Sequence, residues 1–530
     1  MNRRTAGSSA GVLLVLAMGL ALPANLAAQM IDRTQAPNAA NDGIAKSLAE
    51  QIGAGRGDWN TPDSASFLIS RDPFRAIRRG RQIFQRKFTR IQLQGPGVDD
   101  GLGDINTTFT IGAGLSDSCA SCHGRPRGSA GAGGDVVTRP DSRDAIHLFG
   151  LGLKEMLADE MTRSLRVARD QARAEARRTG VAVTRPLVAK GVSFGAITAR
   201  PDGSFDESGI EGVDADLRIR PFFAHGGTIS IREFVVGALR AEMGLEIADP
   251  DTAAASTGAR ITTPAGMFLD GRADRIEAPP VANPYRDVNG NVSGGELPTA
   301  IVDYLEFYLL NYFKPATYRQ TDATRRGLQT FRQIGCASCH VPEFTIDKDR
   351  RVADVETVYD PERGILNGLF ATATPLVESV ADASGFPPVK RPLRQPFVVR
   401  NIFTDFKRHD LGPAFHERNW DGTTQKEFLT RPLWGVGSKI AFGHDGRSIN
   451  LFEAILRHGG EAQRERDAFA ARSDQDQQEL IDFLRTLVLF PPDDTASNLD
   501  PGDRTQPSFP QAGHGSIRLT TIFNDPSDKE

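Results

Sequence analysis

The sequence has little of three features that would decide its class at once. Only four of its 530 residues are cysteine, too few for a scaffold held together by disulfides. Its 63 basic and 67 acidic side chains leave a net charge of −4, so no broad basic field exists to attract a nucleic acid. Beyond the N-terminus, no apolar run reaches the roughly 18 uncharged residues of a membrane span, because the best run, 301–313, contains Asp303 and Glu306.

The composition that remains is that of a globular protein, with 39% hydrophobic and 25% charged residues. The length is too great for one core, so we expect two domains or more. The N-terminal residues 1–28 are typical of an export signal, because Arg3 and Arg4 precede an apolar run at 11–22 and small residues follow. The alternative is an uncleaved anchor. We expect the mature protein in a bacterial periplasm or secreted, without a stable membrane span.

Helical periodicity dominates the middle of the chain, and alternating strand patterns are rare. The two ends lack a sustained period, so we expect a flexible extension at 29–62 and an extended tail at 491–530. Gly-rich connectors leave long loops between the helices. The sequence therefore predicts a mainly α-helical chain. The segments with the clearest helical spacing are 74–88, 151–167, 230–243, 296–313, 324–333, 451–458 and 476–489.

All four cysteines lie in two copies of one pentapeptide, Cys-Ala-Ser-Cys-His, at 119–123 and 336–340. Each copy follows a predicted helix that contains the same sequence pattern, Arg-Gly-x-Gln-x-Phe, at 79–84 and 326–331. The first copy differs by a Gly-rich insertion between helix and pentapeptide. This internal repeat implies two domains of one ancestry, which we place at 63–315 and 316–490.

Cys-x-x-Cys-His is the attachment signature of c-type haem. Two thiols at this spacing can add to the two vinyl groups of one porphyrin, and the histidine that follows then binds the iron. A redox dithiol, a disulfide or a four-cysteine zinc site would also use such pairs, but none of them requires the histidine after both. We therefore predict two cytochrome c-like domains with two covalently bound haem c groups. The attachment residues are Cys119, Cys122, Cys336 and Cys339, and the iron ligands are His123 and His340.

A second ligand for the C-terminal haem is expected from His458. This residue ends a short predicted helix and shares its apolar face with Leu451 and Ile455. A lone histidine on such a face is more often a hydrogen-bonded core residue, but a neighbouring haem favours the ligand role. Two histidines in Pro-bounded loops, His409 and His416, are the alternatives.

Several segments of the second half share a likeness to one family. They are Thr-Arg-Pro-Leu-Trp-Gly-Val-Gly at 430–437, Phe-Gly-His-Asp-Gly-Arg at 442–447 and the segment 453–462. They resemble the di-haem oxidoreductases, which are related to the bacterial di-haem cytochrome c peroxidases and MauG. His-Asp-Leu-Gly-Pro at 409–413 and Phe-Gly-Leu-Gly-Leu-Lys-Glu at 149–155 also resemble family signatures. The resemblance covers most of 74–490 and is densest after 335.

The resemblance implies that the C-terminal haem receives electrons and that the N-terminal haem reacts with peroxide. In that superfamily the distal ligand of the electron-transfer haem follows the histidine of a His-Asp-Gly motif, at the spacing that separates His444 from His458. His444 would then lie near a haem propionate, or be a plain turn histidine. More loosely, 221–243 resembles a peroxidase segment that ends at a catalytic glutamate, which Glu242 would match. Burial would suit this carboxylate to move a proton; the alternative is a solvated helix-end charge.

The sequence also departs from the family around the N-terminal haem. The expected pocket tryptophan is absent, and Ala224 and His225 stand in its place. His225, or less readily His147, could bind the N-terminal iron in a resting form, unless His225 is an exposed loop residue. Trp434 is expected to line the C-terminal haem or simply to fill the core.

The predicted function is peroxide reduction by an exported di-haem c-type oxidoreductase. Electrons would come from a small redox protein of the cytochrome or cupredoxin type, and the oxidant would be peroxide or another small molecule. The alternatives are a di-haem electron-transfer cytochrome without catalysis, and MauG-like or oxygenase chemistry on an organic substrate. An open sixth site on the N-terminal iron would favour catalysis, and two permanent ligands would favour a carrier. We expect export by the Sec route, because haem is attached to an unfolded chain outside the cytoplasm.

Overall fold

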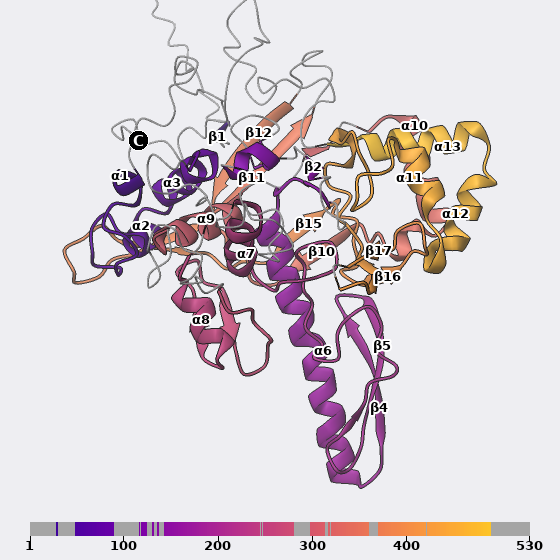
Figure 1. Ribbon diagram of the computed structural model, residues 1–530, viewed down its shortest axis with the longest axis horizontal. Helices are drawn as coiled ribbons and strands as arrows, with labels where there is room; N and C mark the ends of the chain where they lie inside the picture. The colour runs from indigo at the N-terminus through magenta and orange to yellow at the C-terminus, as the bar shows by residue number, and fades with distance from the viewer. Residues whose placement is uncertain are drawn as a thin grey trace, which may run out of the picture.

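The computed structural model describes most of the chain between residues 48 and 488 (Figure 1). The predicted signal peptide, apart from Ala28, and the predicted tail lie outside the described residues. The described ranges are 28–29, 48–88, 116, 118–124, 130–131, 135–136, 143–243, 245, 247–279, 297–312, 316–317, 320–359, 369–419 and 421–488.

All seven segments with predicted helical spacing are helical, which confirms that part of the sequence analysis. The helix beginning at Leu151 is much longer than its pattern indicates, and the stretch expected to be a flexible extension contains a short helix with a buried Leu48. The α-helices of the described residues are α1 (Leu48–Ile52), α2 (Ala65–Arg71), α3 (Pro73–Gln85), α5 (Cys119–His123), α6 (Leu151–Thr179), α7 (Ile231–Met243), α8 (Pro250–Ser256), α9 (Ala300–Asn311), α10 (Asp322–Gln333), α11 (Leu451–Arg457), α12 (Gln463–Ala470) and α13 (Asp474–Arg485).

The prediction of a mainly α fold is wrong, because the described residues also form nine small sheets of two or three antiparallel strands, which makes the fold mixed α and β. These strands are short, and many contain residues that mask a strand pattern, such as Pro186 and Gly195 in β4 and β5. The strands are β1 (Ala28–Gln29), β2 (Asp135–Val136), β3 (Arg143–Asp144), β4 (Val183–Ala189), β5 (Val192–Ala199), β6 (Phe205–Asp206), β7 (Arg260–Thr262), β8 (Phe268–Asp270), β9 (Ala316–Thr317), β10 (Glu343–Ile346), β11 (Ala353–Tyr359), β12 (Leu369–Pro375), β13 (Val377–Val380), β14 (Val389–Pro392), β15 (Phe397–Arg400), β16 (Arg408–Asp410), β17 (Glu417–Arg418), β18 (Thr424–Gln425), β19 (Glu427–Leu429) and β20 (Leu487–Val488).

The Arg-Gly-x-Gln-x-Phe repeat builds the same helix pair twice. Gly80 of α3 lies against α9, where an added Cβ would meet the Tyr304 carbonyl oxygen at 2.3 Å. Gly327 of α10 lies against α13, where an added Cβ would meet the Glu479 carbonyl oxygen at 1.9 Å. Each glycine thus permits a close helix–helix approach that no larger residue allows. In both halves the pair stands directly beside a Cys-Ala-Ser-Cys-His segment.

Three large apolar cores hold these parts together. The first contains α3, α7 and α9, and the third contains α10, α11 and α13. The second joins α6 to β10 and β15, so it draws residues from both sides of the boundary that the sequence analysis places at 315/316. That boundary stays a prediction.

Helix α6 is the longest element and leaves the body of the molecule as an arm. Its N-terminal half is buried, whereas its C-terminal half is covered on one side by the β4–β5 hairpin and projects outward with it (Figure 1). The buried N-terminal end of this arm adjoins both motif-containing regions. Among the described helices, none combines the length and the apolar character required to cross a bilayer.

Candidate functional site

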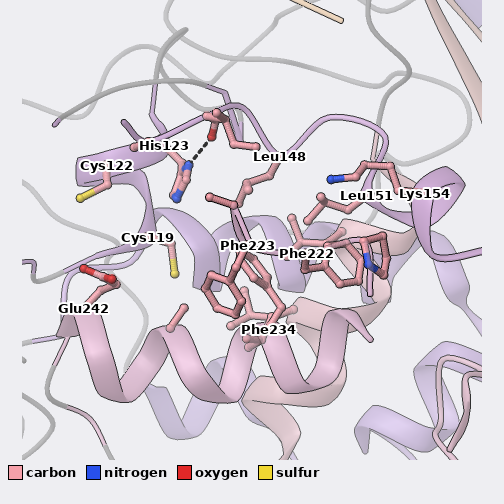
Figure 2. A pocket seen from close by; sticks show the side chains of 18 of the residues that line it. Cys119, Cys122, His123, Leu148, Leu151, Lys154, Phe222, Phe223, Phe234 and Glu242 are labelled. Atoms are coloured by element: carbon pink, nitrogen blue, oxygen red, sulfur yellow. Dashed lines mark hydrogen bonds between the residues drawn. The ribbon is translucent and has the colours of Figure 1, made fainter. Parts of the chain in front are cut away.

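The first Cys-Ala-Ser-Cys-His segment forms the short helix α5. Ser118 precedes the helix, and its hydroxyl accepts the backbone N–H of Ser121, as in an N-cap. Cys119 and Cys122 are free thiols. Together with His123 they line a cavity of about 190 Å³, which we call cavity 1 (Figure 2). Apolar side chains form most of its remaining wall, among them Leu148, Leu151, Phe222, Phe223, Phe234 and Leu239.

The second segment begins with the 3-10 turn η2 (Cys336–Ser338). Gly335 precedes it with φ 98°, a conformation that favours glycine, and so turns the chain out of α10. Cys336, Cys339 and His340 line another cavity of about 320 Å³, which we call cavity 2. The two cysteine pairs thus line different cavities, an arrangement that does not fit a single four-cysteine zinc site.

The histidines of the two motifs are held in the same way. Nδ1 of His123 lies 2.7 Å from the Ile146 carbonyl oxygen, and Nδ1 of His340 lies 3.0 Å from the Phe403 carbonyl oxygen. A carbonyl accepts a hydrogen bond from Nδ1–H, which fixes the tautomer and leaves Nε2 as the nitrogen that can bind a metal. Burial lowers the pKa of His123, and it lowers the pKa of His340 to about 4, so both rings stay neutral, as metal ligation requires.

Cavity 2 contains a second histidine of this kind. His458 stands at the C-terminal end of α11, and its Nδ1 lies 2.8 Å from the Ala454 carbonyl oxygen. Burial lowers its pKa. His340 and His458 line the same cavity, and a positive charge on His458 would lower the pKa of His340. Two neutral imidazoles, each fixed through Nδ1, form a donor set that fits a haem iron.

Cavity 1 is built differently, since His123 is the only histidine in its described lining. The one carboxylate of this described lining is Glu242, near the C-terminal end of α7. Figure 2 shows this carboxylate on the same side of the cavity as Cys122, with the phenylalanines of the wall further along the helix. Val235 and Ala238 of the same helix also line cavity 1, so α7 turns one face toward it.

The two candidate ligands of the N-terminal iron, His225 and His147, lie in different surroundings. His225 is exposed, stacks on Phe223 with ring centroids 6.4 Å apart, and is absent from the described linings of both cavities. His147 lines cavity 2 instead of cavity 1, and its Nε2 lies 2.7 Å from the Trp434 carbonyl oxygen. Burial lowers its pKa to about 3. The structure thus sets His225 at the surface and His147 in cavity 2, and a role of either residue as a ligand of the N-terminal iron stays a prediction.

His444 and Trp434 both line cavity 2. His444 is buried, stacks on Phe428 with centroids 3.9 Å apart, and has Nε2 2.7 Å from an oxygen of Glu417. Trp434 is 4% exposed and belongs to the second apolar core, so it fills the core and lines the cavity at once.

The alternative ligands His409 and His416 both lie close to carboxylates, although His409 also lines cavity 2. Nδ1 and Nε2 of His409 lie 2.6 Å from Glu461 and 2.9 Å from Asp405. Burial lowers the pKa of His409, but hydrogen bonds to Asp405 and Cys339 outweigh this effect and raise it to about 11. Cys339, Asp405 and His409 also lie close enough together to hold a metal ion. His416 contacts Asp410 through Nε2 at 2.7 Å.

Two basic residues that the sequence analysis did not single out belong to both linings. Lys154 and Arg431 each line cavity 1 and cavity 2, so they stand in the wall that the cavities share. Both occur inside motifs already noted, at 149–155 and 430–437. A cation in a segment of glycines and apolar residues is the signal that could have identified them.

In a comparison with known proteins, part of the chain matches the model of one family. Residues 372–487 match the model of the family described as "di-haem oxidoreductase, putative peroxidase". This confirms the resemblance for the segment that contains His444 and His458. No curated protein matches the chain.

Among solved structures, a chain of hydrazine synthase from Kuenenia stuttgartiensis is similar to this chain. The match has 16% sequence identity and a TM-score of 0.22, and it covers 38% of this chain and 59% of that chain. A likeness of this size carries no argument about fold or function.

Proposed function

We propose that this protein is a di-haem c-type oxidoreductase that reduces peroxide. Haem would be attached through Cys119 and Cys122 in cavity 1 and through Cys336 and Cys339 in cavity 2. The family matched by 372–487 supports haem and oxidoreductase chemistry. The residues present fit the group, because each cavity joins two free thiols to a neutral histidine whose Nδ1 faces a backbone carbonyl.

The competing uses of the thiols fit less well. Burial raises the pKa of Cys119 and of Cys336 to about 12, so these thiols stay protonated at neutral pH. A redox dithiol requires a thiolate as its nucleophile, and the surroundings of Cys119 and Cys336 oppose one at these two positions. Addition of the thiols to porphyrin vinyl groups is the use that also explains both histidines.

The two cavities differ in the donor groups that line them, and this difference is the basis for assigning their roles. Cavity 2 offers two histidines, His340 and His458, that would both hold a haem iron, as in an electron-transfer centre. Cavity 1 offers His123 and, instead of a second histidine, the Glu242 carboxylate. A haem held by His123 alone could bind a small oxidant, so this donor set favours catalysis over electron transfer alone.

When bound in cavity 1, haem iron would supply the redox chemistry that cleaves the O–O bond. Glu242 would accept a proton from one peroxide oxygen and deliver it to the other as the O–O bond breaks. The whole reaction consumes hydrogen peroxide, two electrons and two protons and releases two water molecules. The electrons would come from a small redox protein, by way of cavity 2. The apolar wall of Phe222, Phe223 and Phe234 limits the water that could compete for this proton.

An electron carrier is the second candidate, and one contact favours it. Met243 also lines cavity 1, with its sulfur 3.9 Å from Sγ of Cys119. A methionine thioether is an ordinary sixth ligand of c-type haem. Magnetic circular dichroism of the oxidised protein would detect such ligation, and Met243→Leu would abolish it.

The experiment that tests the proposal starts with the intact mass of the exported holoprotein. Two haem masses should remain after denaturation, and one should be lost in Cys119→Ala/Cys122→Ala and one in Cys336→Ala/Cys339→Ala. The half-reduced protein should then consume hydrogen peroxide when mixed rapidly with it. A mass without haem would overturn the cofactor assignment. Two haems without peroxide consumption would favour the carrier or an oxygenase acting on an organic substrate. Cleavage of the predicted signal, and export itself, would be read from the same mass.

A further inference from the structure

Lys154 is fixed in place by the unusual start of α6. Gly150 has φ 73°, and an added Cβ there would meet the Trp434 ring at 2.6 Å. Gly152 lies against α9, where an added Cβ would meet the Leu310 carbonyl oxygen at 2.1 Å. The two glycines of the Phe-Gly-Leu-Gly-Leu-Lys-Glu segment thus allow the first turn of α6 to pack between α9 and Trp434. This packing sets Lys154 in the wall between the cavities.

The Lys154 ammonium is buried without a counter-charge. The residue is 7% exposed, and its Nζ lies over the Phe222 ring, 5.4 Å from the centroid. Throughout the described ranges no carboxylate forms an ion pair with it. Burial lowers the pKa of Lys154, the nearby charge of Arg431 lowers it further, and together they bring it to about 7. A buried ammonium without a carboxylate partner beside two apolar cavities is costly unless an anion is bound there, since the Phe222 ring offsets only part of its desolvation cost.

We propose that Lys154 and Arg431 form a carboxylate-binding site in the wall shared by cavity 1 and cavity 2. This inference rests on the proposed function, because the carboxylate favoured by the geometry is a haem propionate. The vinyl and propionate groups of haem lie on opposite edges of the porphyrin. Attachment at Cys119 and Cys122 therefore directs the propionates across cavity 1. Figure 2 shows the Lys154 amine on the side of the cavity opposite Cys122 and Glu242.

Because the same two residues also line cavity 2, the site lies between both haem positions. A positive charge there opposes the extra positive charge of oxidised iron and so favours the reduced state of a neighbouring haem. Lys154 and Arg431 are in this sense positioning residues. They would hold a carboxylate edge between the cavities and raise the reduction potentials of the haems.

The test uses the complete holoprotein and three variants. Lys154→Met removes the charge but keeps the length of the side chain, and Lys154→Arg keeps the charge. Lys390→Met is the matched control, because Lys390 also lies over a ring, 5.2 Å from the Phe74 centroid, and lines neither cavity. Haem content is measured first. Both reduction potentials are then recorded by spectroelectrochemistry, with and without sodium acetate as a free carboxylate.

A bound propionate predicts a lower potential for at least one haem in Lys154→Met without acetate, and parental potentials in Lys154→Arg and Lys390→Met. If the site instead binds a carboxylate from solution, Lys154→Met should have parental potentials without acetate. Acetate should then shift the potentials of the parent but not those of Lys154→Met. Either result supports a carboxylate site. Two bound haems with parental potentials in Lys154→Met under both conditions would overturn the site. A parent protein without haem would instead overturn the proposed function.

Discussion

Replacing Glu242 by Gln tests the catalytic role of cavity 1 most directly. Glutamine keeps the size of the side chain but cannot carry a proton between two oxygens. Glu242 is the only carboxylate in the described lining of cavity 1, and its neighbours there are mostly apolar. Of the other ionisable groups, His123 is the proposed iron ligand and Lys154 lies on the opposite side (Figure 2).

Because the described lining of cavity 1 holds no second carboxylate, the loss should equal the full share of a positioned acid–base group. We expect peroxide turnover to fall by roughly 10²–10⁴-fold. This corresponds to about 2.7–5.5 kcal/mol of transition-state stabilisation. A solvated helix-end charge would change stability by no more than about 0.5 kcal/mol and would leave turnover near the parental value.

The assay is rapid mixing of half-reduced holoprotein with hydrogen peroxide, followed through the haem absorbance. Glu233→Gln is the matched control, since Glu233 belongs to the same helix but is absent from the described lining of cavity 1. Haem content and reduction of the C-terminal haem should be parental in both variants. If Glu242→Gln retains turnover within a factor of about two of the parent, the acid–base assignment is refuted.

Three further predictions follow from other parts of the structure. His458→Ala should convert one of the two haems to a high-spin or water-ligated form while both stay attached; an unchanged low-spin spectrum would refute the ligand assignment. Gly327→Ala should destabilise the protein by several kcal/mol, because a Cβ would overlap the Glu479 carbonyl of α13, and thermal unfolding of the holoprotein measures this. Burial raises the pKa of Glu233 from 4.5 to about 7, so the stability gained from its protonation is fully present below pH 4.5 and is lost as the pH rises through 7. Glu233→Gln should flatten the pH dependence of the unfolding free energy in this window, which denaturant titrations at several pH values would show.

The helices and the repeat could be predicted from the sequence because their signals are local. The Arg-Gly-x-Gln-x-Phe segments place a glycine and a phenylalanine on one helix face, and both helices form where expected. The grouping of His458 with His340 in one cavity also agrees with the expected placement, although its role as a ligand stays a prediction.

The sheets and the shared wall could not be predicted, for different physical reasons. β4 has Pro186 and mostly half-exposed residues in its first half, so no alternating apolar pattern marks it as a strand. The position of Lys154 depends on long-range packing, because Arg431 and Trp434 come from a segment far along the chain. A single sequence shows a lysine near the start of a helix, where solvent exposure is the ordinary expectation.

The shared wall also bears on the order in which the protein is assembled. Cavity 1 takes Thr404, Phe406 and 429–432 into its lining, although its cysteines lie at 119 and 122. A chain that emerges N-terminus first exposes the first cysteine pair long before the segment that closes this cavity has arrived. We therefore expect cavity 1 to stay open while the chain is exported, which would leave Cys119 and Cys122 accessible to the proposed haem attachment. Closure would then come last, when Trp434 packs against Gly150 and joins the two halves of the chain.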